Sequence, residues 1–163
     1  MKLTAYLSGG MEFAENYGAN WRTELSGWLG ENLSHSIFDP VRASEKFLTD
    51  KYPDTNFRLT KLSNLARHRE IAGKIVDLDC EEIILRSDYV ICYYDESAQR
   101  GAGTKGELTI ARVFGKPVYL VIGMEMERIP SWVLGCTDKI FNDFDSLKIF
   151  LLKQFANISP AKV

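Results

Sequence analysis

The sequence predicts a three-layer α/β fold in which helices cover both faces of a parallel sheet of about five strands. Short apolar runs alternate along the chain with segments of helical spacing, the pattern of parallel strands joined by crossover helices. One run, residues 89–94, is apolar throughout, as expected of a central strand buried on both faces. With 163 residues, 45% of them apolar and 26% charged, the chain has the size of one globular domain, so we expect a single domain over residues 1–163.

The first half of the chain supplies two strands and the first helices. We expect strands at residues 3–7 and 36–39 and a helix over residues 19–33. Residues 41–56 are polar, contain Pro53 and lack a clear period, which predicts an irregular surface excursion. Residues 57–87 fit one long helix or two abutting helices, with Gly73 as the weak point.

The second half continues the alternation. After the strand at residues 89–94 and a polar loop, we expect a helix over 104–114, strands at 118–122 and 139–141, and helices over 129–134 and 144–155. This order predicts a flavodoxin-like or Rossmann-like fold with right-handed crossovers. In such sheets ligands bind beyond the carboxyl ends of the strands, so the turns after the strands are the candidate site.

Composition narrows the function. The net charge is −2 and no run of Lys or Arg stands out, so we expect a small-molecule partner and neither a nucleic acid nor a membrane surface. The chain lacks a signal peptide or an apolar run of roughly 18 residues, which predicts a cytoplasmic protein. The three cysteines show no CxxC spacing and only two histidines occur, so we expect no metal and no cofactor. Any catalysis would have to use carboxylates.

A glycine-rich stretch, RGAGTKGE at residues 100–107, leads into the predicted helix at 104–114 and supports two interpretations. Thr104 and Glu107 match a capping box, in which the two side chains satisfy backbone donors at the helix start. Gly106, in contrast, costs about 0.5–1 kcal/mol relative to alanine inside a helix and adds nothing to a cap. Together with Gly101 and Gly103 it favours a helix N-terminus that presents N–H groups to a phosphate or carboxylate.

The same stretch excludes some chemistry and favours another. It has neither the Gly-Lys-Ser/Thr of a Walker loop nor the third glycine of GxGxxG, so nucleoside triphosphate hydrolysis is disfavoured. Glu107 lies at the carboxyl edge of the sheet in a chain without a usable histidine. Attack on a sugar carbon suits such a carboxylate, because the oxocarbenium-like transition state needs a nearby anion and a second carboxyl can protonate the leaving group.

Several short motifs resemble, in order, the nucleoside 2-deoxyribosyltransferase family and its nucleotide N-glycosidase relatives. They are YLSGGM at residues 6–11, NWR at 20–22, FDP at 38–40, Ser87 with Asp88, GTKGEL at 103–108, Ala111, and GKP at 115–117. The match extends from about residue 3 to residue 122. The ordered set agrees with the fold that the alternation of elements predicts.

The resemblance implies a retaining mechanism in which Glu107 attacks the anomeric carbon of a (deoxy)nucleoside or its 5′-monophosphate and water or a second base then takes the sugar. Tyr6 matches the tyrosine that orients the nucleophile, although a strand aromatic would look the same. Ser8, Gly9 and Gly10 match the loop that shapes the nucleoside pocket, although an ordinary turn would do so too. The family's second carboxylate falls on Asp79, with Asp77 as the competitor. The resemblance also implies a homo-oligomer, a dimer or larger.

One position departs from the family pattern. Six residues before the nucleophile, where the family carries an Asp or Ser that binds the sugar hydroxyl or the phosphate, this chain has Gly101. Asp95, Ser97 or the backbone amides of Gly103 and Thr104 are candidates for that contact. The choice between a free nucleoside and its 5′-monophosphate as the substrate therefore stays open. Asp39, after the second strand, lies on the same edge and is a further candidate for substrate binding. We expect Asp88 to lie in a structural turn where the helix gives way to the strand. Trp21 should contribute to packing, and Arg22 should be a surface or interface charge.

Three rival functions compete with glycosidic cleavage. The GxGTxxE spacing also resembles nucleoside-monophosphate phosphoribohydrolases, which carry a longer Pro-Gly-Gly run that is missing here. A non-catalytic nucleotide sensor would keep the cleft with Glu107 turned away and bonded to Thr104 as a cap. In a structural subunit Glu107 would contribute only to stability. We hypothesise that Glu107 both caps the helix and attacks the sugar.

Overall fold

The computed structural model describes residues 2–155 and contains a five-stranded sheet in which every strand pair is parallel. The strand order is β2-β1-β3-β4-β5. The strands are β1 (Thr4–Gly9), β2 (Ser36–Phe38), β3 (Tyr89–Tyr94), β4 (Val118–Ile122) and β5 (Lys139–Phe141). The predicted α/β fold with a parallel sheet of Rossmann-like type is confirmed.

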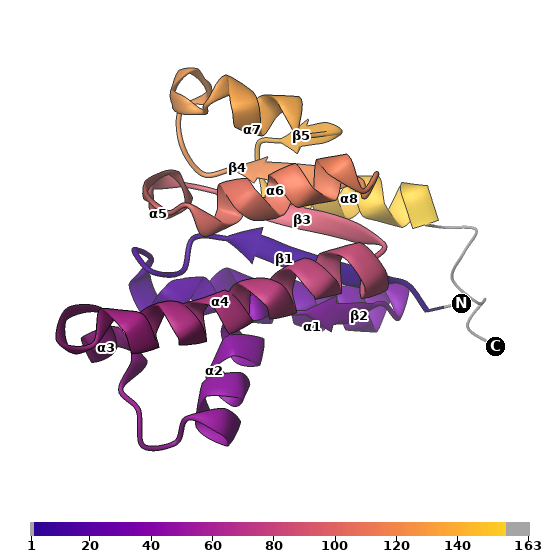
Figure 1. Cartoon of the computed structure of the whole chain (residues 1–163). Helices are drawn as coiled ribbons and strands as arrows, with labels where there is room; N and C mark the ends of the chain where they lie inside the picture. The colour runs from indigo at the N-terminus through magenta and orange to yellow at the C-terminus, as the bar shows by residue number, and fades with distance from the viewer. Residues whose placement is uncertain (1, 156–163) are drawn as a thin grey trace.

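Helices cover both faces of this sheet (Figure 1). On one side lie α1 (Ala19–Leu33) and α8 (Phe144–Phe155), and on the other lie α4 (Leu65–Glu81), α6 (Gly103–Val113) and α7 (Ser131–Gly135). Successive side chains of a strand point to opposite faces, so β1 sends Tyr6 into one core cluster and Ala5 and Leu7 into the other. The two clusters are the interior of the three-layer fold.

The chain changes direction across the sheet at β1. From β1 it runs to β2 on one side, and after α4 it returns to β3 on the other side of β1. The register pairs Ala5 with Ile37 of β2, and Leu7 with Ile91 of β3. The reversal makes the gap between β1 and β3 the topological switch point, where open parallel sheets leave a crevice at their carboxyl edge.

The expected surface excursion at residues 41–56 is wrong, because α2 (Pro40–Lys51) occupies most of it. The Asp39 carboxylate accepts the Val41 N–H at the N-cap, and Pro40 stands at the first helical position, where its missing N–H costs nothing. Most of this helix faces solvent, so its sequence has a weak apolar period. The aspartate cap and the proline after it are the sequence signals that predict this helix.

The expected weak point at Gly73 is also wrong. Gly73 lies inside α4, and the break falls at Asn64, between α3 (Phe57–Ser63) and α4. Asn64 ends one helix by donating its N–H to Thr60 and starts the next by accepting the Arg67 N–H on its side chain. A capping side chain therefore separates the two helices where a flexible glycine does not. The last turn of the segment is a π-helix, η2 (Glu82–Arg86).

The stretch after β3 is helical as well. A short helix, α5 (Glu96–Arg100), begins directly at Asp95, where a polar loop was expected. Asp88, at the entry to β3, accepts the Thr4 N–H at 2.7 Å, so its predicted role in a structural turn is confirmed. A 3₁₀ turn, η3 (Met126–Arg128), precedes α7. Elsewhere the expected strands and helices agree with the observed ones to within a few residues.

None of the helices in residues 2–155 has both the length and the apolar character that crossing a bilayer requires. Within the same range, no group of three or more His, Cys, Asp or Glu side chains is placed to hold a metal ion. Cys92 and Cys136 are buried free thiols, and Cys80 is a partly exposed one.

Candidate active site

The carboxylate of Glu107 lies at the switch point and is held by two hydroxyl groups of β1. The Tyr6 hydroxyl donates to Oε1 at 3.0 Å, and the Ser8 hydroxyl donates to Oε2 at 2.5 Å. Tyr6 and Ser8 are two residues apart on one strand, so both face the same side of the sheet, where the first turns of α6 pack. The predicted pairing of Tyr6 with Glu107 is therefore present.

The capping box expected from Thr104 and Glu107 is absent. Helix α6 begins at Gly103 with Ala102 as its N-cap, and no side chain caps it. Thr104 is thus already helical, and Glu107 lies too far into the helix to reach a free backbone donor. The hypothesis that Glu107 also caps the helix is wrong. Its carboxylate points toward β1, which is the opposite of the orientation expected of a sensor that uses Glu107 as a cap.

Asp79, in the last turn of α4, is the second carboxyl of the site. Burial and the nearby charge of Glu107 raise the pKa of Asp79 from 3.8 to about 8, and this carboxyl also lies beside the Tyr6 hydroxyl. Its Oδ1 is buried and has no hydrogen-bond partner among the described residues. Asp77 is exposed on another side of the helix. Of the two candidates, only Asp79 shares the site with Glu107.

Opposing effects act on the ionisation of Glu107. Burial raises its pKa, whereas the hydrogen bonds from Ser8 and Tyr6 and the positive charge of Arg22 lower it. The Tyr6 hydroxyl has a pKa well above 10, because burial and the Glu107 charge both disfavour the phenolate. Tyr6 is therefore a permanent donor to Glu107. Burial has the largest effect, so the pKa of Glu107 lies above its ordinary value, as does that of Asp79. A nucleophile and a general acid need a carboxylate and a neutral carboxyl side by side, and this pair of carboxyls can supply them.

Arg22 is a residue of the site that sequence reasoning placed wrongly on the surface. Its side chain on α1 is fully buried and donates to the backbone carbonyls of Leu7, Gly9, Gly10, Tyr17 and Gly18, at 2.9 to 3.4 Å. Asp39 lies 3.7 Å from its Nε and balances the charge. The signal was available: Arg22 stands three residues before Leu25, on the stripe that α1 buries. Trp21 packs against Tyr93 and Phe144, as expected.

The loop between β1 and α1, residues 10–18, depends on these bonds. Asn16, Tyr17 and Gly18 follow one another in the left-handed region, with φ of 46°, 55° and 70°. Such a run is strained for side chains other than glycine and persists when its surroundings fix it. At the other end of the loop, a Cβ on Gly10 would lie 1.9 Å from the Ser97 hydroxyl, so only glycine fits against α5. Arg22 thus anchors the loop that follows Ser8.

Three of the predicted substrate contacts have structural partners. Asp39 caps α2 and balances Arg22. Asp95 caps α5, with Oδ1 accepting the N–H groups of Ser97 and Ala98 at 3.0 Å and the Ser97 hydroxyl at 2.5 Å. Each of these carboxylates is therefore engaged in holding a helix at the carboxyl edge of the sheet.

The predicted glycines lie around the start of α6. Gly101 ends α5, and Gly103 opens α6. Lys105 fixes this connection by donating to the carbonyls of Gln99 and Gly101 at 2.5 and 3.1 Å. A Cβ at Gly103 or Gly106 would meet no described atom within 4 Å, so neither glycine is required by packing. The amides of Gly103, Thr104 and Lys105 precede the first intrahelical bond, Gly106 N–H to Ala102, and form the positive end of the helix.

A cavity of about 780 Å³ lies beyond the strand ends, between the β1–α1 loop, α2 and the α3–α4 pair. Aromatic rings of Phe13, Tyr17 and Phe57 line it. Ile75, which lines it too, stands one helical turn before Asp79 on α4, so the cavity approaches the site along α4, although Glu107, Tyr6, Ser8 and Asp79 do not line it themselves. Ser44 of α2 contributes a buried hydroxyl with no hydrogen-bond partner among residues 2–155. Sequence reasoning missed this residue because it missed the helix.

Comparisons with known proteins add no family to this geometry. A scan against protein-family models finds none that matches the chain, and a search of curated proteins finds no match. The candidate function therefore rests on the motifs and on the arrangement of Glu107, Tyr6, Ser8 and Asp79.

Proposed function

We propose that the protein cleaves the N-glycosidic bond of (deoxy)nucleosides or their 5′-monophosphates through a covalent glycosyl-enzyme on Glu107. The observation that carries this proposal is the Glu107 carboxylate, held by Tyr6 and Ser8 at the switch point, with the high-pKa carboxyl of Asp79 beside it. A retaining glycosidase uses two neighbouring carboxyls, one as the nucleophile and one as the general acid.

In the first step a Glu107 carboxylate oxygen attacks the anomeric carbon. The carbon–nitrogen bond breaks and its electron pair leaves with the base, which Asp79 protonates. The bonds from Tyr6 and Ser8 leave lone pairs on both Glu107 oxygens, because each carboxylate oxygen accepts about two hydrogen bonds. They fix the direction of attack while the nucleophilic lone pair stays available.

In the second step water or another base attacks the same carbon from the opposite side. The bond to Glu107 breaks, the carboxylate recovers its charge, and the attacking group gives its proton to the Asp79 carboxylate. Two displacements restore the original configuration of the sugar. The buried positive charge of Arg22 favours the ionised form of Glu107 in the free enzyme, and so favours its departure in this step.

The proposal includes a cytoplasmic homo-oligomer that acts on small molecules in nucleotide metabolism. Large apolar side chains on the α4–α6–α7 side support the oligomer: Leu85, Val113 and Trp132 are 68%, 73% and 67% exposed. The neighbouring carboxyls of Glu107 and Asp79, both with a raised pKa, and the two hydroxyl donors support a glycosyl transfer that needs no cofactor.

Base release from a panel of nucleosides and nucleoside 5′-monophosphates tests the proposal. Each is incubated with and without a second free base, and the products are separated by chromatography. We expect release that falls by at least about 1,000-fold in Glu107→Gln, which keeps the size of the side chain but cannot attack. Glu31→Gln makes the same change at an exposed position of α1 and should keep full activity. Equal release by wild type and Glu107→Gln would refute the mechanism.

A further inference from the structure

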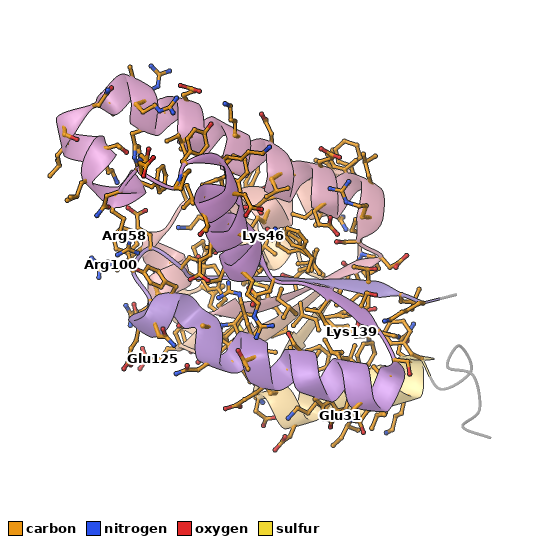
Figure 2. All side chains as sticks on the ribbon, turned by 90° about the horizontal axis from the view of Figure 1, so that it is seen from below. Glu31, Lys46, Arg58, Arg100, Glu125 and Lys139 are labelled. Carbon is orange, nitrogen blue, oxygen red and sulfur yellow. The ribbon has the colours of Figure 1, made fainter. Side chains whose placement is uncertain are left out.

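Two guanidinium groups from different elements lie over the aromatic rings of the β1–α1 loop. Arg58 of α3 stacks over Tyr17 with its Cζ 4.2 Å from the ring centroid, and Arg100 of α5 stacks over Phe13 at 4.6 Å. Tyr17 and Phe13 both line the cavity, as does Arg58 itself. Figure 2 labels both arginines at the same end of the molecule, the end at which Figure 1 places α3 and α5.

Neither guanidinium has a carboxylate within 4 Å among the described residues, whereas most other arginines do. Arg22, Arg42, Arg67, Arg86 and Arg128 are each paired with an Asp or Glu. The remaining unpaired arginines in residues 2–155 are Arg69 and Arg112, and neither lines the cavity. Two guanidinium groups without a carboxylate partner thus lie over the β1–α1 loop, in a chain whose net charge is −2.

The other charged groups at the cavity do not occupy the two arginines. Lys61 pairs with Glu12 at 3.0 Å, which neutralises both. Glu45 of α2, the remaining acidic side chain in the lining, balances the formal charge of Arg58 without pairing with it, and Arg100 adds one positive charge beside the cavity. His68 has its Nδ1 close to Thr60 and to the Phe57 carbonyl. The two guanidinium groups are therefore available to an anion.

Stacking positions a guanidinium without using its hydrogen bonds. The face of the group contacts the ring, and its N–H donors point outward in the plane, where they match the oxygens of a phosphate in pairs. The aromatic ring also reduces the side-chain freedom that binding must remove. Arg58 and Arg100 are therefore prepared for a phosphate and lack a protein partner that would compete for it.

The interior of the cavity indicates that the anion is part of a larger ligand. Ser44 lines this cavity, but its hydroxyl oxygen is buried below the surface and is not a ligand contact. The volume of about 780 Å³ falls in the range of small-molecule sites and exceeds what a phosphate alone would fill. A phosphate at the two arginines and a ring system against the aromatic lining of Phe13, Tyr17 and Phe57 account for the charge and the volume.

We propose that the substrate is a nucleoside 5′-monophosphate and that Arg58 and Arg100 bind its phosphate. This inference rests on the proposed function, since it names the substrate of that same site. It assigns to Arg58 of α3 and to Arg100, the first residue of the glycine-rich stretch, the contact that Gly101 cannot make.

Binding without turnover tests the inference separately from the chemistry. In Glu107→Gln protein, calorimetry compares adenosine, guanosine, cytidine and uridine and their 2′-deoxy forms with the corresponding 5′-monophosphates. We expect at least one monophosphate to bind about 100-fold more tightly than its nucleoside. Adding Arg58→Gln or Arg100→Gln should each reduce that ratio by about tenfold, and Arg112→Gln should leave it unchanged. Both target side chains are exposed, so the fold should tolerate the changes.

The outcomes separate the two proposals. A ratio near one for every pair, or a ratio that survives the double Arg58→Gln and Arg100→Gln change, overturns the phosphate assignment. If wild-type enzyme releases base from nucleosides only, the glycosidase stands and the monophosphate inference fails. If the arginine-dependent preference is found but no base is released, the phosphate site stands and the proposed function fails. Competition by inorganic phosphate that depends on both arginines would support the site further.

Discussion

The Tyr6 hydroxyl lies 3.0 Å from Oε1 of Glu107, although the two residues are 101 positions apart in the chain. Tyr6 is fully buried in β1 and its pKa lies well above 10, so this hydroxyl stays protonated and donates to the carboxylate at every pH at which the protein works. A donor that never ionises stabilises the charged form of its partner. The relationship gives Glu107 both its direction and part of its acidity.

Replacing Tyr6 by phenylalanine should therefore change the pH dependence of base release. Loss of the donor raises the pKa of Glu107, so the acidic limb of the kcat/KM profile moves to higher pH, and the maximum falls by about 10- to 100-fold. Tyr119→Phe removes the same hydroxyl from a buried tyrosine on the other face of the sheet and is the control. An acidic limb that stays in place in Tyr6→Phe would show that the hydroxyl does not act on Glu107.

Asp79 should make the protein less stable in alkaline solution. Its folded pKa of about 8 lies above the ordinary value of 3.8, so its contribution to stability is complete below about pH 4 and is lost as the pH rises through 8. Asp79→Asn removes this loss, which is at most about 6 kcal/mol in total and at most about 4 kcal/mol between pH 5 and pH 8. Urea unfolding at pH 5 and pH 9 measures it. Exposed Asp77 provides the control, because Asp77→Asn should leave the pH dependence unchanged, and an equal slope in Asp79→Asn and wild type would contradict the assignment.

The buried guanidinium of Arg22 should be among the most important side chains for stability. Arg22→Met leaves five carbonyls without their donor and removes the buried one of the two arginines beside Asp39, which should cost about 3–5 kcal/mol. Chemical denaturation followed by circular dichroism measures the change. Arg112→Met, on the exposed side of α6, should lie within about 0.5 kcal/mol of wild type. A similarly small effect of Arg22→Met would mean that the loop is held by other contacts.

Gly106 allows a test of why the helix start is rich in glycine. Packing does not require it, because a Cβ there would meet no described atom within 4 Å. Gly106→Ala should therefore stabilise the fold by about 0.5–1 kcal/mol. If the glycine is kept for the close approach of a substrate, the same variant should lose activity while it gains stability. Thermal unfolding and base release on one preparation measure both. A Gly106→Ala protein that is less stable than wild type would contradict the claim that packing does not require glycine at this position.

The strands could be predicted because each is a short apolar run that ends in a turn residue, as β3 does at Asp95. Helix α2 could not be found by its period, because the core needs only Pro40, Val41 and Ser44 from it and the rest faces solvent. Its capping signal, an aspartate before a proline, outweighed the missing period. The break at Asn64 follows the same rule. The capping side chain of Asn64 separates α3 from α4, whereas Gly73 lies inside α4 and does not interrupt it.

The site was only partly predictable for a related reason. Parallel strands bring their carboxyl ends to one edge, so Glu107, Tyr6 and Ser8 could be expected together. The capping box was misleading because the starting residue of α6 depends on how Lys105 holds the preceding turn. The place of Arg22 on the buried stripe of α1 indicates a buried side chain, but its partners are mostly backbone carbonyls, which carry no signature in the sequence.

The covalent intermediate on Glu107 is the central claim, and intact-mass spectrometry tests it most directly. Fluorine at carbon 2 of the sugar slows both steps, because both transition states are oxocarbenium-like, and a good leaving group on the same analogue restores the first step, so the sugar adduct accumulates. With such an analogue of the best substrate, we predict wild-type protein that gains the mass of one sugar, on a peptide that contains Glu107. Glu107→Gln should gain none. Base release by wild type without any sugar adduct, or an adduct on another residue, would contradict the account.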